Sequence, residues 1–169
     1  MKKHILLFLL FQCAGAAWAG DEFSAVRCGA DIPKVLMGKS AKKEKVRLTE
    51  SRHKDIGLQN LGGDEVSDRI FVSTWRICGK EYFLLHQRGI IRDVLLFPEH
   101  NKDTPAFGGY CSVDGRDVPE YIYGVAENKG GMEASVRAAW KVDEKRSKFV
   151  EMPLAGLRCP GSEIFSVDR

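Results

Sequence analysis

Few residues in this sequence have catalytic potential. His53 and Asp55 lie two positions apart, and side chains at i and i+2 share one face of a strand, so the carboxylate could orient the imidazole as a general base. His86 is a further candidate base, at the end of an apolar run. A hydrolase also needs a nucleophile, and the sequence contains no G-x-S-x-G motif. A hydrolase with a dispersed site that uses His53, Asp55 or His86 therefore remains an alternative function.

The spacing of cysteine and histidine argues against a metal site. Structural zinc usually requires close cysteine pairs such as C-x-x-C, and no two cysteines here lie near each other. His100 has no partner at metal-ligand spacing, and the acidic stretch Leu61–Asp68 lacks the ligand order of an EF-hand loop. The sequence therefore predicts neither a metal ion nor another cofactor.

The N-terminus has the three parts of a signal peptide. Lys2 and Lys3 precede the apolar run Ile5–Phe11, and Ala17-Trp18-Ala19 fits a signal peptidase site. The apolar run is shorter than the roughly 20 residues that a membrane span requires. We therefore predict a signal peptide over residues 1–19, a single secreted β-rich domain over residues 20–169, and a secreted or periplasmic location without a transmembrane span.

Four cysteines follow the predicted signal peptide. In an exported chain, an even number of cysteines is typical of a disulfide framework, so we expect two bridges and no free thiolate. Three connectivities are possible, and the sequence does not choose among them. The bridging residues are Cys28, Cys78, Cys111 and Cys159.

The charge balance argues against a nucleic-acid partner, whereas the distribution of charge favours an anionic partner at one segment. Residues 20–169 hold 24 of the 26 basic residues and all 23 acidic residues, which gives 24 minus 23, or +1, and this argues against a nucleic-acid binder. The segment 34–54, however, carries eight basic residues against two acidic ones, as an anion-binding patch would. A solvated loop and edge strand is the other interpretation. The candidate binding residues are Lys42, Lys43, Arg47, Arg52, His53 and Asp55.

The stretch Arg69–Pro98 is the centre of the predicted fold. Its three apolar runs, rich in β-branched and aromatic residues, are broken at Gly79 and at residues 87–89, which predicts an antiparallel meander. The alternation in Ala134–Val142 predicts a strand with Val136, Ala138, Trp140 and Val142 inward, paired with Phe149–Met152. Alternation in Lys45–Glu50 predicts another strand.

One short helix is expected near the N-terminus. Asp31 can cap it, Pro33 suits its first turn, and Gly38 can end it. With seven or eight short strands at intervals of about 10 residues, the chain is predicted to be mainly β, an antiparallel sandwich or small barrel.

These predictions favour binding over catalysis. We expect an exported, disulfide-stabilised binding module, inhibitor-like or adaptor-like, whose partner is a protein or an anionic envelope polymer. The alternatives are the dispersed hydrolase and a structural component of the envelope. Neither a nucleic acid nor a cofactor is expected as a partner.

Overall fold

The computed structural model describes residues 22–127, 135–159 and 164–165. The predicted signal peptide lies outside these residues. For residues 43–46 and 164–165 only the backbone is described.

The first sheet is the predicted meander with one more strand. It consists of β1 (Gln59–Ser67), β2 (Ile70–Ile77), β3 (Lys80–Gln87) and β4 (Ile90–Leu96), all antiparallel and in chain order. Two of its reversals are two-residue turns, Cys78-Gly79 and Arg88-Gly89, in which both residues have positive φ. This is the type I′ geometry, whose twist matches that of the flanking strands. The predicted breaks in the apolar runs are therefore confirmed.

The second sheet and a small third sheet complete the β structure. The second has the order β10-β9-β8-β5-β12, and the third has the order β11-β6-β7. Their bounds are β5 Ala106–Gly109, β6 Ser112–Val113, β7 Arg116–Asp117, β8 Ile122–Glu127, β9 Ser135–Asp143, β10 Lys148–Glu151, β11 Leu157–Arg158 and β12 Ile164–Phe165. The mainly β, antiparallel prediction is confirmed, although the described strands outnumber the seven or eight that were expected.

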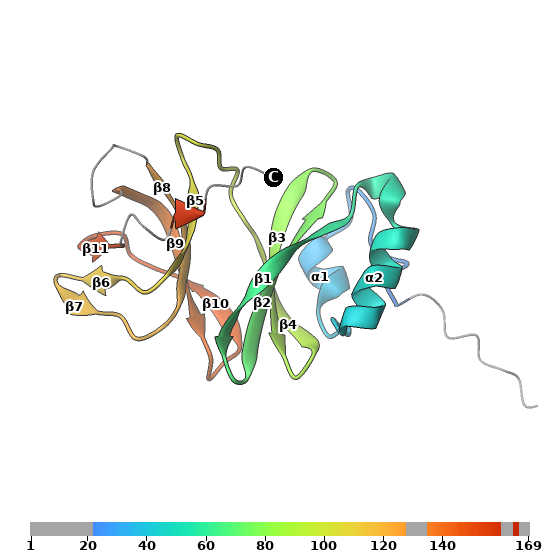
Figure 1. Ribbon diagram of the computed structural model, residues 1–169, viewed down its shortest axis with the longest axis horizontal. Coiled ribbons are helices and arrows are strands. Elements are labelled where there is room, and N and C mark those ends of the chain that lie inside the picture. The colour runs from blue at the N-terminus through green and yellow to red at the C-terminus, as the bar shows by residue number, and fades with distance from the viewer. Residues whose placement is uncertain (1–21, 128–134, 160–163, 166–169) are drawn as a thin grey trace, which may run out of the picture.

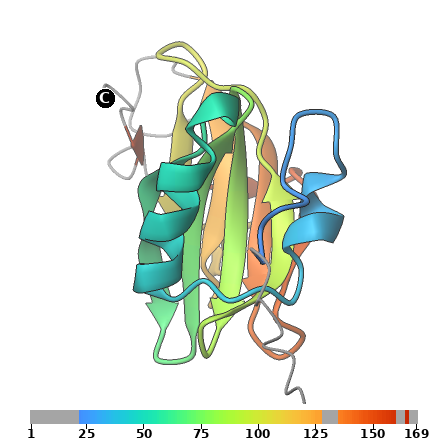
Figure 2. The ribbon, with the colours of Figure 1, turned by 90° about the vertical axis from the view of Figure 1, so that its right-hand side faces the viewer.

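Helices cover the outer face of the first sheet (Figures 1 and 2). The predicted short helix is α1 (Ile32–Leu36), where the Asp31 carboxylate accepts a hydrogen bond from the Lys34 amide. A second helix, α2 (Lys43–Arg52), precedes the 3-10 turn η1 (Lys54–Ile56). The expectation of one helix was therefore too low.

The predicted strand over Lys45–Glu50 is wrong, because these residues lie in α2. Lysine, glutamate, arginine and leucine all have high helix propensity, and the apolar alternation covers only two residues. In a helix, side chains at i and i+2 point about 200° apart, so they cannot both face the sheet. Leu48 is accordingly 52% exposed, and Thr49 is the buried residue.

Three apolar clusters separate the layers of the molecule. The middle cluster joins the two large sheets, with Val72 and Phe83 on one side and Tyr123 and Val142 on the other. An inner cluster fills the space between the first sheet and the N-terminal segment with α1. An outer cluster covers the far side of the second sheet and includes both Cys111 and Cys159.

The predicted alternation in β9 holds for only half of the strand. Trp140 and Val142 face the middle cluster, as expected, and the hairpin with β10 is confirmed. A register shift in the pairing of β8 with β9 then changes the direction of the earlier residues. Val136 consequently packs in the outer cluster, on the opposite face from Trp140.

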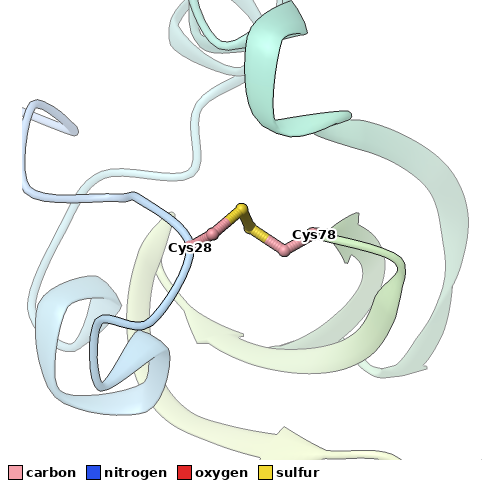
Figure 3. The surroundings of a disulfide bond; sticks show 2 residues. All are labelled: Cys28 and Cys78. Carbon is pink, nitrogen blue, oxygen red and sulfur yellow. A yellow bond between two sulfur atoms is a disulfide. The ribbon is translucent and has the colours of Figure 1, made fainter.

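The two predicted disulfides are present, and the structure identifies their connectivity. Cys28 pairs with Cys78, and Cys111 pairs with Cys159. The first bridge joins the segment before α1 to the turn between β2 and β3 (Figure 3). Two disulfides are compatible with a secreted or periplasmic protein. No helix in the described residues has the length and apolar character that a membrane span needs.

Candidate functional site

The predicted binding segment forms α2 and the turn after it, on the outer side of the first sheet (Figure 2). Two neighbouring residues, Thr49 and Glu50, help to fix α2 to the molecule. Thr49 is buried, and the Glu50 carboxylate accepts a hydrogen bond of 2.6 Å from the backbone amide of Asn60 in β1. The carboxylate therefore holds the helix against the edge strand of the sheet.

The candidate cations are distributed along the whole helix. Lys42 precedes the first residue of α2, Arg47 lies in its middle, and Arg52 is its last residue. All three side chains are exposed. Lys43 begins the helix, and its side chain lies outside the described part of the chain. Since ten helical residues span about 15 Å, these charges can contact an extended partner but do not form one compact pocket.

His53 and Asp55 lie at the end of this segment. His53 follows the last residue of α2, and Asp55 is in η1. The argument that they share a strand face therefore does not apply, because both residues have helical surroundings. The segment is fixed to the Cys78 end of β2, since the Cys78 amide donates a hydrogen bond of 2.8 Å to the Ile56 carbonyl.

The structure does not bring His86 to His53. His86 lies six residues along β3 from Lys80, which is the residue that follows the Cys78-Gly79 turn. At about 3.3 Å per residue, this is a separation of about 20 Å along the strand. The three residues proposed for a dispersed hydrolase site therefore do not gather in one place.

His86 instead contacts a serine that the sequence did not indicate. The Ser73 hydroxyl oxygen lies 2.8 Å from Nε2 of His86, across the β2–β3 pair. The two residues are only 4% and 6% exposed. The exposed ring of Phe71 lies beside the imidazole, with the ring centres 5.8 Å apart.

The surroundings of His86 make its imidazole a weak base. Burial lowers the pKa of His86 to about 4, because the charged form loses its hydration. A base with so low a pKa accepts a proton poorly near neutral pH. No described carboxylate forms a hydrogen bond with this ring, and a buried serine is poorly accessible to substrate. The pair therefore fits a structural hydrogen bond better than a nucleophile with its base.

The register of the β2–β3 hairpin could have revealed Ser73. A two-residue turn at Cys78-Gly79 places Ile77 opposite Lys80, and counting back then places Phe71 opposite His86. Ser73 is the next residue of β2 on the same face as Phe71. The signal was therefore present in the sequence, in the turn rather than in any motif.

A second group of polar residues surrounds His100. The Glu81 carboxylate forms an ion pair of 2.7 Å with Arg76 and lies 3.6 Å from Nε2 of His100. The other ring nitrogen of His100 lies 3.1 Å from the Pro98 carbonyl oxygen. These contacts hold the loop that leaves β4 against the end of the first sheet. Across residues 22–127, 135–159 and 164–165, no three histidine, cysteine or acidic side chains gather as metal ligands would.

Comparisons of the chain with models of protein families, with curated proteins and with solved structures found no match.

Proposed function

We propose that this chain is an exported, disulfide-stabilised binding module, inhibitor-like or adaptor-like, that captures a protein or an anionic envelope polymer through α2 and the loops beside it. The observation that carries the proposal is the outward face of α2. Among its described side chains, Thr49 is buried and the Glu50 carboxylate binds β1, while basic side chains and a large apolar side chain point to solvent.

The side chains that α2 exposes suit a binding partner better than they suit the fold. A surface helix that packs on the core of its own protein usually buries an apolar stripe wider than about 100°. Among the side chains described in α2, Leu48 is 52% exposed and Arg47 is exposed beside it. Arginine is enriched at the energetic centres of protein interfaces.

The charges of α2 favour an anionic partner. Lys42 and Arg47 have no ion-pair partner within 4.0 Å among the described side chains. An anion that binds here would not have to displace an existing carboxylate from either residue. The electrostatic attraction would be screened beyond roughly 8 Å at physiological salt, so capture should weaken as salt rises.

The hydrolase hypothesis has less support. His53 and Asp55 lie beside the Cys78 end of the first sheet, and His86 lies at the other end with a lowered pKa. A purely structural envelope protein is the remaining alternative, and it would capture no specific partner.

The test is capture from an envelope extract by the immobilised mature protein. Replacing Lys42, Lys43, Arg47 and Arg52 by alanine should abolish capture of the principal bound species. The matched control replaces four other exposed bases, Arg27, Lys80, Arg116 and Arg137, and removes the same charge. Capture that both variants reduce equally would indicate a general charge effect, and capture that neither variant reduces would refute the proposal.

A further inference from the structure

Three chain reversals meet at one end of the molecule, along the lower edge of Figure 1. They join β1 to β2, β3 to β4, and β9 to β10. The Ser67 hydroxyl donates a hydrogen bond of 2.9 Å to the Glu144 carboxylate, which links the first reversal to the third. The Phe149 amide donates one of 2.8 Å to the Asp93 carboxylate, which links β10 to β4.

The start of α2 lies at the same end. The Ala41 amide donates a hydrogen bond of 2.9 Å to the Gly89 carbonyl, and a β-carbon added at Gly89 would lie 3.5 Å from the side chain of Lys42. We call Lys42 together with residues 67–70, 87–92 and 143–148 the reversal end.

The reversal end is rich in exposed bases from segments far apart in the sequence. It has seven basic residues against three acidic ones, a balance of 7 minus 3, or +4, compared with +3 for the whole chain. The acidic residues are Asp68, Asp143 and Glu144, and Glu65 and Asp93 lie next to them. The basic residues are Lys42, Arg69, Arg88, Arg92, Lys145, Arg146 and Lys148.

Most of the nearby carboxylates are engaged in contacts within the protein. Asp93 accepts hydrogen bonds from the Val94 and Phe149 amides. Asp143 accepts one from the Arg146 amide and pairs with its guanidinium at 3.7 Å. The other six bases have no ion-pair partner within 4.0 Å among the described side chains. These bases are therefore available to an external anion.

The three reversals do not lie along one line. The first two reversals belong to neighbouring strand pairs of one sheet, so about two strand spacings, roughly 10 Å, separate them. The third belongs to the sheet packed against it, and packed sheets lie roughly 10 Å apart. The three reversals therefore form a triangle with sides of about 10 Å. A flat surface can contact all three corners at once, whereas a linear chain cannot do so without bending.

We propose that the reversal end binds the surface of a bilayer that contains anionic phospholipids. Three of its available bases are arginines, whose guanidinium groups bind phosphate oxygens in pairs. The contact is peripheral, made with the lipid headgroups. It goes beyond the capture proposed for α2, because it uses a ligand of a different chemical class and a surface that shares only Lys42 with the capture residues.

Sedimentation with phospholipid vesicles tests this proposal. The wild-type protein should sediment with vesicles that mix phosphatidylglycerol with phosphatidylcholine, should not sediment with pure phosphatidylcholine, and should be released as salt rises. A triple variant, Arg69→Gln, Arg88→Asn and Lys148→Gln, removes one base from each reversal. Asparagine suits position 88 because Arg88 has φ +55° and precedes a glycine.

The triple variant should bind the anionic vesicles about 100-fold more weakly, since each base near such a surface contributes about fivefold. The control Lys54→Gln, Lys80→Gln and Arg116→Gln, which lies away from the reversal end, should bind like the wild type. Unchanged binding of the triple variant would overturn the proposal. Binding to soluble polyphosphate without binding to vesicles would also overturn it, in favour of a polymer ligand.

The two binding proposals can fail separately. The triple variant keeps all four bases that the capture experiment removes from α2. A protein that sediments with vesicles but captures no partner would refute only the proposed function. One that captures its partner without sedimenting would refute only the membrane contact.

Discussion

The two disulfides close loops of nearly equal length but hold different kinds of structure. Cys28 and Cys78 are separated by 50 residues, and Cys111 and Cys159 by 48. Under the chain-entropy account, each bridge therefore contributes about 4 kcal/mol by restricting the unfolded chain. The difference between them lies in the folded protein.

The first bridge holds a segment that is packed on the first sheet but hardly paired with it. Phe23 and Val26 are buried in the inner cluster, and the Phe23 ring centre lies 5.8 Å from that of Trp75. The backbone of this segment reaches the sheet at an isolated bridge, Ser40 to Ile90. Cys28 itself is exposed. The N-terminal layer thus depends on side-chain burial, on a few backbone hydrogen bonds around that bridge and on one accessible disulfide.

The second bridge lies beside chain segments that are already paired. Leu157 and Arg158 in β11 pair with Val113 and Ser112 in β6, next to the two cysteines. Cys111 and Cys159 are 5% and 4% exposed. The two bridges therefore restrict the unfolded chain equally, but the folded structure around the first depends more on its disulfide than the structure around the second does. The exposed bridge should also react with external thiols more readily than the buried one.

Removal of each bridge should give the largest effects on stability. We expect Cys28→Ser with Cys78→Asn, and separately Cys111→Ala with Cys159→Ala, to lower the free energy of unfolding by about 4 kcal/mol each. Asparagine is chosen at position 78 because Cys78 has φ +53° in a type I′ turn. Urea unfolding measures both losses.

Hydrogen exchange then distinguishes the two variants. Only the first variant should lose amide protection in residues 22–41 while the sheets keep theirs. Mild reduction followed by alkylation should modify Cys28 and Cys78 before Cys111 and Cys159. Two results would contradict the difference between the bridges. One is simultaneous modification of all four cysteines, and the other is an equal loss of amide protection in residues 22–41 and in the sheets of the first variant.

The stability of the protein should also respond to acid through His86, which lies on the face of the first sheet that carries the inner cluster. Its pKa is about 4 in the folded protein, against a usual value near 6.5, so the unfolded chain binds the proton more readily. The contribution of neutral His86 to the free energy of unfolding is fully present above about pH 6.5. It is lost as the pH falls towards 4 and changes no further below that. A shift of this size corresponds to about 3 kcal/mol.

The variant His86→Gln isolates this effect, because glutamine does not titrate and can still form a hydrogen bond with Ser73. The difference in unfolding free energy between wild type and variant should change by about 3 kcal/mol between pH 7 and pH 4. A difference that stays constant over this range would show that His86 is not the titrating group.

The sequence predicted the parts of the fold that are determined locally. The glycine turns and β-branched runs of residues 69–98 led to the correct meander, because both signals act within a few residues. The pairing of the cysteines could not be predicted, since it depends on which layers pack together. In the same way, the bulge that turns Val136 to the outer cluster depends on the partner strand.

The candidate site shows the limit of local reasoning more clearly. The basic segment was identified by composition, but its alternation at Val46 and Leu48 led to the wrong element. Short apolar alternations are ambiguous between strand and helix, and here helix propensity and burial of Thr49 determine the outcome. Ser73 required knowledge of cross-strand register.

The smallest expected effect tests whether α2 belongs to the layer held by the first bridge. Glu50→Ala removes the acceptor of the Asn60 amide, a contact of 2.6 Å. A hydrogen bond to a charged group contributes about 1.5 to 3 kcal/mol, and this exposed contact should lie at the lower end of that range. Because the contact joins α2 to β1 alone, the loss should appear as faster hydrogen exchange in residues 43–52 and at Asn60. The midpoint of global unfolding should hardly change. Glu50→Gln, which keeps an acceptor oxygen, should restore most of the protection. If Glu50→Ala also exposes residues 22–41, then α2 and the disulfide-held segment unfold as one cooperative unit rather than as two segments held at separate points.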